Sequence, residues 1–101
     1  MHMLRVITTD TDVREIKLID VSNLYSERPL PINEETFELA LAIRQNKHLI
    51  DALPPITVVQ KLTGMFQIKD GRHRFLAFRL NGIKKIKARV SKERAYISNS
   101  S

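Results

Sequence analysis

The residues best suited to chemistry lie together in the segment Asp70-Gly71-Arg72-His73-Arg74, between a hydrophobic run that ends at Ile68 and the amphipathic stretch from Phe75 to Leu80. A strand that turns into a helix here leaves the first backbone N–H groups of the helix without intrahelical acceptors and with positive partial charge. Phosphate oxygens are natural acceptors for such groups. The pattern therefore predicts an anion site at the start of this helix.

Each member of the segment also has its own chemical capacity. Gly71 has no Cβ, so a phosphate could approach the backbone closely. Arg72 and Arg74 can donate forked, charge-assisted hydrogen bonds, and His73 can change its charge near neutrality. Asp70 suits a helix N-cap, a metal or substrate contact, or an ion pair with Arg74 one turn later. We expect these five residues to form the phosphate-binding site, with His73 also a candidate for catalysis.

The composition limits the chemistry that the chain can perform. Its 101 residues include no cysteine, which excludes disulfides, thiolate catalysis and cysteine-based zinc sites. The three histidines, His2, His48 and His73, do not have short ligand spacing, so we expect no metal site built mainly from protein imidazoles. The longest apolar run, residues 39–43, is too short to cross a membrane, and no secretory signal is present. We expect a soluble, cytoplasmic protein without membrane partners.

Positive charge is concentrated around the same segment. The formal net charge is +6, and residues 69–101 contain 10 Lys or Arg but only 2 Asp or Glu. Phosphates, on a nucleotide or along a nucleic acid, are natural partners of such a field. A solvated surface without any partner is the alternative. The candidate nucleic-acid contacts are Lys84, Lys85, Lys87 and Arg89.

The whole chain has room for one small domain, and its pattern predicts an α+β fold with a small mixed β-sheet and covering helices. Residues 1–12 are expected to form a loosely ordered lead-in, although residues 4–7 could pair as a short edge strand. Residues 13–92 form the expected domain. Residues 93–101 are expected to be a polar tail that frays, unless residues 95–97 dock on a partner.

Hydrophobic periodicity gives the order strand, loop, helix, hairpin, helix and strand. The first helix is expected after the N-cap Asn33, with a buried stripe formed by Phe37, Ala40, Leu41 and Ile43. In the last strand, Ile86, Ala88 and Val90 should face inward, while Lys85, Lys87 and Arg89 face outward. The other elements are expected as strands at 13–18, 56–59 and 65–68, a turn at 62–64, and a second helix at 75–80 that ends at Asn81-Gly82.

This order of elements, with Pro54-Pro55 before the hairpin and Asn81-Gly82 before the last strand, resembles the ParB/sulfiredoxin superfamily over about residues 13–92. The segment 70–74 is most similar to the free serine kinase branch, whose signature is Asp-Gly-His-His-Arg; only Arg72 departs from it. The resemblance implies a nucleotide site for ATP, ADP or CTP with Mg²⁺. Backbone N–H groups from Gly71 to Arg74 would hold the phosphates there, and His73 and Arg74 would contact their oxygens.

The resemblance also implies a candidate catalytic carboxylate. In kinase-like members, a glutamate after the first strand acts in catalysis, and Glu27 is similarly placed, with Glu34 and Glu35 as competitors. Phosphotransfer or nucleotide hydrolysis would be the reaction class, and the sequence leaves open whether either occurs.

Two departures narrow the choice within the superfamily. Sulfiredoxins carry Gly-Gly-Cys-His-Arg, and Arg72 stands here at the position of the reactive cysteine, which excludes sulfiredoxin chemistry. Partition ParB proteins carry Gly-Glu-Arg-Arg and continue into further domains, so we expect this chain not to be a complete partition protein.

Three functions therefore follow from the sequence. The first is a module that binds nucleotide phosphates at Asp70 to Arg74, with or without catalysis. The second is a small basic DNA-binding or regulatory module without catalysis. The third is a protein-contact module that forms a homo-oligomer through its tail or an exposed edge strand.

Overall fold

The computed structural model describes residues 3–10 and 14–100. The strands are β1 (Met3–Asp10), β2 (Glu15–Asp20), β3 (Leu24–Tyr25), β4 (Ile56–Gln60), β5 (Phe66–Asp70) and β6 (Lys85–Ser100). The helices are α1 (Glu34–Gln45), α2 (Leu49–Ala52) and α3 (Arg72–Leu80), with a 3₁₀ turn η1 at Val21–Asn23. None of the described helices has the length and hydrophobicity needed to span a membrane.

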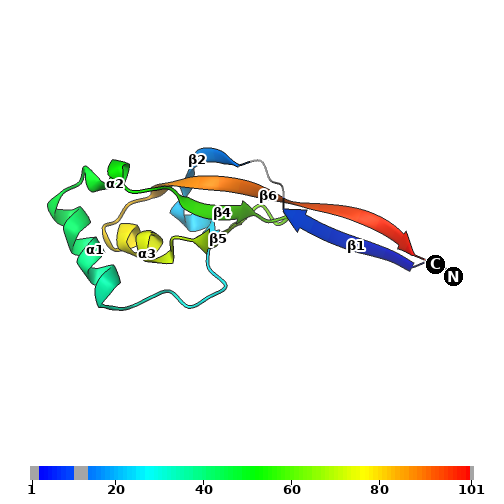
Figure 1. The fold of residues 1–101 in the computed structure, drawn as a ribbon, viewed down its shortest axis with the longest axis horizontal. Coiled ribbons are helices and arrows are strands. Elements are labelled where there is room, and N and C mark those ends of the chain that lie inside the picture. Colours follow the sequence, from blue (N-terminus) through cyan, green and yellow to red (C-terminus); the bar gives the residue numbers. More distant parts are fainter. Residues whose placement is uncertain (1–2, 11–13, 101) are drawn as a thin grey trace.

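The strands form a mixed sheet in the order β1-β6-β4-β5-β3, and β2 pairs with the first half of β6. The β4–β5 pair is antiparallel, which confirms the predicted hairpin, whereas β4–β6 and β3–β5 are parallel. This arrangement confirms the predicted α+β fold with a mixed sheet. Figure 1 shows the helices gathered at one end of the sheet, with α3 connecting the end of β5 to the start of β6.

The hydrophobic core lies between the sheet and the helices α1 and α3. As predicted, Ile86, Ala88 and Val90 of β6 are buried, while Lys85, Lys87 and Arg89 are exposed. Alternation along the strand produces this result, because successive side chains point to opposite faces. The other buried members of the core are Ile19, Leu24, Ala40, Ile43, Ile56, Val58, Ile68, Phe75, Ala77 and Phe78.

Helix α1 begins as predicted, but its buried face differs from the predicted one. The Asn33 side chain accepts a hydrogen bond from Thr36 N at 3.1 Å, which confirms the N-cap. The buried positions are Thr36, Ala40 and Ile43, whereas Phe37 and Leu41 are exposed. The prediction of a stripe containing Phe37 and Leu41 was therefore wrong. Ala40 and Ile43 are buried as predicted, but the third buried position is Thr36, so a threonine instead of a phenylalanine contacts α3 through His73.

The first and last segments form strands in place of the expected loose lead-in and fraying tail, and the alternative of an edge strand at residues 4–7 is confirmed. Residues 3–10 form β1, which pairs in antiparallel register with residues 93–100 of β6, from Met3 opposite Ser100 to Asp10 opposite Glu93. These two stretches form a ribbon that projects from the sheet, away from the helices (Figure 1). Their backbone groups satisfy one another across the ribbon. None of the described helices lies over the ribbon (Figure 1), and its sequence lacks the regular alternation that marks the first half of β6.

The remaining boundaries shift by a few residues. The first predicted strand, at 13–18, is β2 at Glu15–Asp20, in which Ile19 is buried while Ile16 and Leu18 are exposed; Val13 lies outside the described residues. The sequence did not predict α2 or the two-residue strand β3. Both are too short to produce a periodic pattern.

Candidate functional site

The segment 70–74 joins β5 to α3, as the sequence predicts. Asp70 is the last residue of β5, and Gly71 is the N-cap of α3, with its carbonyl accepting from Phe75 N at 2.8 Å. No side chain caps this helix, so the proposed cap role of Asp70 was wrong. The first turn of α3 therefore starts without a side-chain acceptor for its N–H groups.

Gly71 is required here by the backbone and by packing. Its φ is +101°, in the left-handed region that favours glycine. A Cβ at this position would lie 2.6 Å from Ile56 Cγ2 and 2.9 Å from Ile56 Cβ. Because the missing Cβ would point at a wholly buried isoleucine, the glycine is explained by the fold without any ligand.

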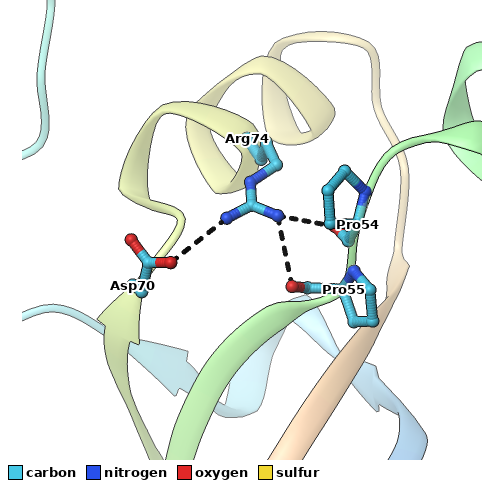
Figure 2. A network of polar contacts seen from close by, with 4 residues as sticks. All are labelled: Pro54, Pro55, Asp70 and Arg74. Atoms are coloured by element: carbon cyan, nitrogen blue, oxygen red, sulfur yellow. Dashed lines mark hydrogen bonds and ion pairs between the residues drawn. The ribbon is translucent and has the colours of Figure 1, made fainter.

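Arg74 holds the start of α3 against the chain that leads into β4. Figure 2 shows its guanidinium between Asp70 on one side and Pro54 and Pro55 on the other. Nη1 donates to the carbonyl oxygens of Pro54 at 2.7 Å and Pro55 at 3.2 Å, and Nη2 lies 3.5 Å from Asp70 Oδ2. The ion pair with Asp70, one of the alternatives for both residues, is present. The side chain of Arg74 is only 18% exposed, so its donors are largely committed to the protein.

Arg72 makes a similar contact with the loop before α1. Its Nη1 donates to the carbonyl oxygen of Pro29 at 2.6 Å. In the same loop, Ser26 Oγ donates to the carbonyl oxygen of Arg28 at 2.7 Å. Arg72 therefore fixes the loop that forms one wall of the site. Carbonyl partners carry no net charge, so both guanidinium groups still contribute positive potential.

His73 contacts α1. Its Nδ1 lies 2.8 Å from Thr36 Oγ1, and Thr36 Oγ1 also donates to the carbonyl oxygen of Pro31 at 2.6 Å. Thr36 is completely buried, at 0% exposure. The imidazole is thus anchored by one nitrogen to the interior of the domain.

An open cleft of about 320 Å³ lies at the start of α3. It contains the whole 70–74 segment and four residues that sequence reasoning did not assign to phosphate binding: Arg28, Glu35, Leu39 and Lys69. Its lining includes four Arg or Lys side chains and two carboxylates. Such a lining favours an anion. Lys69 stands directly before the motif, so its position was the sequence signal that could have included it.

Glu27, the predicted catalytic carboxylate, and the predicted nucleic-acid contacts lie outside this cleft lining. Glu27 is exposed on the loop between β3 and α1, while Glu35, one of the competing glutamates, lines the cleft from the first turn of α1. The candidate nucleic-acid residues are all exposed on or just before β6: Lys84, Lys85, Lys87 and Arg89. Across the β2–β6 register, exposed Leu18 stands opposite Lys87 and exposed Ile16 opposite Arg89.

Comparison with protein families gives a match over nearly the whole chain. The model of the ParB N-terminal domain matches residues 5–98. The chain belongs to the ParB N-terminal domain family. This match confirms the superfamily predicted from the motif and the order of elements. It also includes most of the β1–β6 ribbon of this ParB N-terminal domain. No curated protein matches the sequence.

Solved structures support the same fold. The C-terminally truncated chromosome-partitioning protein ParB from Caulobacter crescentus, complexed with CTP-γ-S, is 24% identical, with a TM-score of 0.60 over 75% of this chain and 43% of that chain. Sulfiredoxin from Arabidopsis thaliana is 25% identical, with a TM-score of 0.59 over 77% of this chain and 85% of that chain. The Caulobacter crescentus ParB complexed to the centromeric parS site is 24% identical, with a TM-score of 0.51 over 73% of this chain and 37% of that chain.

The shared fold does not determine the function of this chain. This ParB N-terminal domain spans less than half of the ParB chains that it matches. The match includes most of the sulfiredoxin chain, but the present chain has no cysteine with which to perform thiol chemistry. The fold is therefore common to all of them, and function must be argued from the cleft.

Proposed function

We propose that this ParB N-terminal domain binds the phosphate groups of a nucleotide in the cleft at the start of α3, with ATP, ADP or CTP as candidates. The observation that carries the proposal is the gathering of four basic side chains around an uncapped helix start. A structural neighbour complexed with CTP-γ-S gives further support.

The contacts differ in kind among the residues of the cleft. Lys69 and Arg28 are exposed and can donate directly to phosphate oxygens. Backbone N–H groups of the first turn of α3 supply further donors. Arg74 contributes mainly charge, because its guanidinium is largely buried and already donates to Pro54 and Pro55. Arg72 donates to Pro29 through Nη1 and keeps other N–H donors for a phosphate. Asp70 orients Arg74, and Gly71 shapes the turn.

A divalent ion would depend on the nucleotide itself. Within residues 3–10 and 14–100, no three His, Asp or Glu side chains gather closely enough to hold a metal ion. Mg²⁺ binds reluctantly without phosphate or carboxylate oxygens and keeps several waters. The phosphates would therefore provide its main ligands, with Asp70 and Glu35 as the carboxylates nearest to them in the cleft lining.

Isothermal titration calorimetry with CTP, ATP and ADP, each with Mg²⁺, tests the proposal. Lys69→Met should weaken the binding by about tenfold, since one charge-assisted hydrogen bond is lost. Lys87→Met is the matched control, because it removes the same charge from an exposed position outside the cleft lining. Absence of binding by every nucleotide, or equal weakening by the two variants, would refute the proposal.

Catalysis would need a carboxylate or His73 close to the bound phosphates. Glu27 and His73 are the residues that the sequence assigned to this role, and Glu35 now lies in the cleft lining. Nucleotide turnover by Glu27→Gln and Glu35→Gln variants distinguishes the two glutamates. Loss of turnover in only the Glu35 variant would assign the role to α1, and unchanged turnover in both would remove the carboxylates from catalysis.

A second candidate is binding to DNA through β6. The favouring observation is that Lys85, Lys87 and Arg89 are exposed at alternate positions of one strand and so share a face. Phosphate contacts would make the affinity fall steeply with salt. A gel-shift series at increasing salt, with the Lys87→Met variant and with nucleotide as competitor, tests this function. This function would be contradicted if the DNA affinity did not change with salt concentration. It would also be contradicted if Lys69→Met weakened DNA binding more than Lys87→Met.

A further inference from the structure

The hydroxyl of Thr36 determines which nitrogen of His73 carries a proton. Thr36 Oγ1 lies 2.6 Å from the carbonyl oxygen of Pro31, and a carbonyl can only accept. A hydroxyl has one hydrogen, so this hydrogen is committed to Pro31. The same oxygen lies 2.8 Å from His73 Nδ1. Nδ1 must therefore be the donor in that second contact and carry a hydrogen.

The other ring nitrogen then has a defined character. In a neutral imidazole with hydrogen on Nδ1, Nε2 holds the lone pair and accepts hydrogen bonds. No buried side-chain nitrogen or oxygen among the described residues lacks a partner, and Nε2 has no hydrogen-bond partner among these residues, so Nε2 is accessible to solvent. His73 lines the cleft. An acceptor thus stands in a site whose other side chains are mostly cationic donors.

We propose that Thr36 is a positioning residue that locks neutral His73 in the Nδ1–H form, so that Nε2 selects a phosphate group carrying an O–H. A protonated phosphate oxygen can donate to Nε2, whereas a fully deprotonated oxyanion places its lone pairs against that of Nε2. The ligand class is a terminal phosphate in its protonated form, with no Mg²⁺ on that phosphate, because a bound Mg²⁺ displaces the proton. This selection rests on the proposed phosphate site, while the tautomer of His73 does not depend on it.

Charged residues from several elements line the cleft together with His73. They are Arg28 from the loop before α1, Glu35 from α1, Lys69 and Asp70 from β5, and Arg72 and Arg74 from α3. None of them bonds to either ring nitrogen, and the contact with Thr36 is the hydrogen bond that the structure gives to the ring. Thr36 is therefore the residue to change.

Long-range ¹H–¹⁵N NMR of the ring nitrogens, at a pH where the spectrum shows a neutral imidazole, measures the tautomer directly. Wild type and Thr36→Ser should show hydrogen on Nδ1, because serine retains the hydroxyl. Thr36→Val keeps the shape without the hydroxyl and should populate the Nε2–H form. Exposed His48 provides the internal control. An Nε2–H form in wild type, or an Nδ1–H form that survives in Thr36→Val, would overturn the positioning role.

Inorganic phosphate and sulfate test the ligand class at the same pH. The two anions are similar in size and shape, but sulfate carries no O–H at neutral pH. Wild type and Thr36→Ser should bind phosphate more tightly than sulfate by about tenfold, and Thr36→Val should lose most of that preference. Equal binding of the two anions by wild type would refute the selection. If neither anion binds while the tautomer is as expected, the proposed phosphate site fails and the positioning of His73 stands.

Discussion

Replacing Arg74 tests whether this side chain is mainly a clamp of the fold or a ligand of phosphate. Arg74→Met keeps most of the aliphatic stem and removes all hydrogen-bond donors. The carbonyl oxygens of Pro54 and Pro55 then lose their partner, which lies 2.7 Å and 3.2 Å away in the wild type. The start of α3 would be released from the chain that leads into β4.

The cost follows from the number and exposure of these contacts. A hydrogen bond from a charged donor contributes about 1.5–3 kcal/mol, and the Pro54 contact belongs at the low end because water can reach it. The contact with Asp70 adds less than about 0.5 kcal/mol, since that carboxylate is 78% exposed and 3.5 Å away. The expected loss of unfolding free energy is about 2–4 kcal/mol. For a domain of this size, that lowers Tm by about 10–25 °C.

Thermal and urea unfolding, followed by circular dichroism, measure this loss. Arg74→Lys keeps one charged donor and should lose about half as much stability, while Asp70→Asn should change it by less than about 0.5 kcal/mol. The clamp role would be refuted if Arg74→Met were as stable as the wild type and lost more nucleotide affinity than Lys69→Met. Arg74 would then be the phosphate ligand that the motif first suggested.

Three further outcomes are expected from the same structure. Gly71→Ala should lower the unfolding free energy by about 2–4 kcal/mol in urea titrations, because φ is +101° and the added methyl group meets a buried isoleucine. Asn33→Ala removes the cap of α1 and should cost about 1 kcal/mol, with Asn33→Asp as the control that keeps it. A hydrogen bond from Lys61 holds the pKa of the Glu93 carboxyl below its ordinary value. This pair therefore stabilises the fold fully at pH values above the ordinary pKa of glutamate. Its contribution is lost as the pH falls through the lowered pKa that Glu93 has in the folded state. Measuring the unfolding free energy of the wild type and of Glu93→Gln from pH 7 to pH 3 tests this direction. Curves of unfolding free energy against pH that run parallel for the two proteins would contradict it.

The features that local sequence determines could be predicted. The cap at Asn33 depends on residues three positions apart, and the alternation in the first half of β6 depends on neighbours along one strand. The segment 70–74 could be placed between a strand and a helix because both flanking patterns are strong. The superfamily followed from the motif within this order of elements, and the family match confirms it.

The features that depend on contacts between distant residues could not be predicted. Phe37 and Leu41 are apolar and one helical turn apart, so they form a plausible buried stripe, yet Thr36 is the residue inside. A buried hydroxyl is tolerated only with partners, and the partners of Thr36 are Pro31 and His73, the latter 37 positions away. Periodicity contains no information about such a contact. It therefore favoured the larger apolar side chains.

The two arginines of the 70–74 segment can attract a ligand by their charge while donating hydrogen bonds to the protein itself. As donors, Arg72 and Arg74 serve the fold, because they hold Pro29, Pro54 and Pro55 against the start of α3. As charges, they remain effective, since backbone carbonyls do not neutralise a guanidinium and Asp70 offsets Arg74 only partly. Two unit charges 4 Å apart attract by about 1 kcal/mol in water and about 4 kcal/mol at an effective dielectric constant of 20. A phosphate in the cleft would therefore be attracted by both arginines while receiving its hydrogen bonds from Lys69, Arg28, the helix N–H groups and the N–H groups of Arg72 that do not donate to Pro29. The same five residues can in this way build the turn and favour its ligand without either role competing for the same donors.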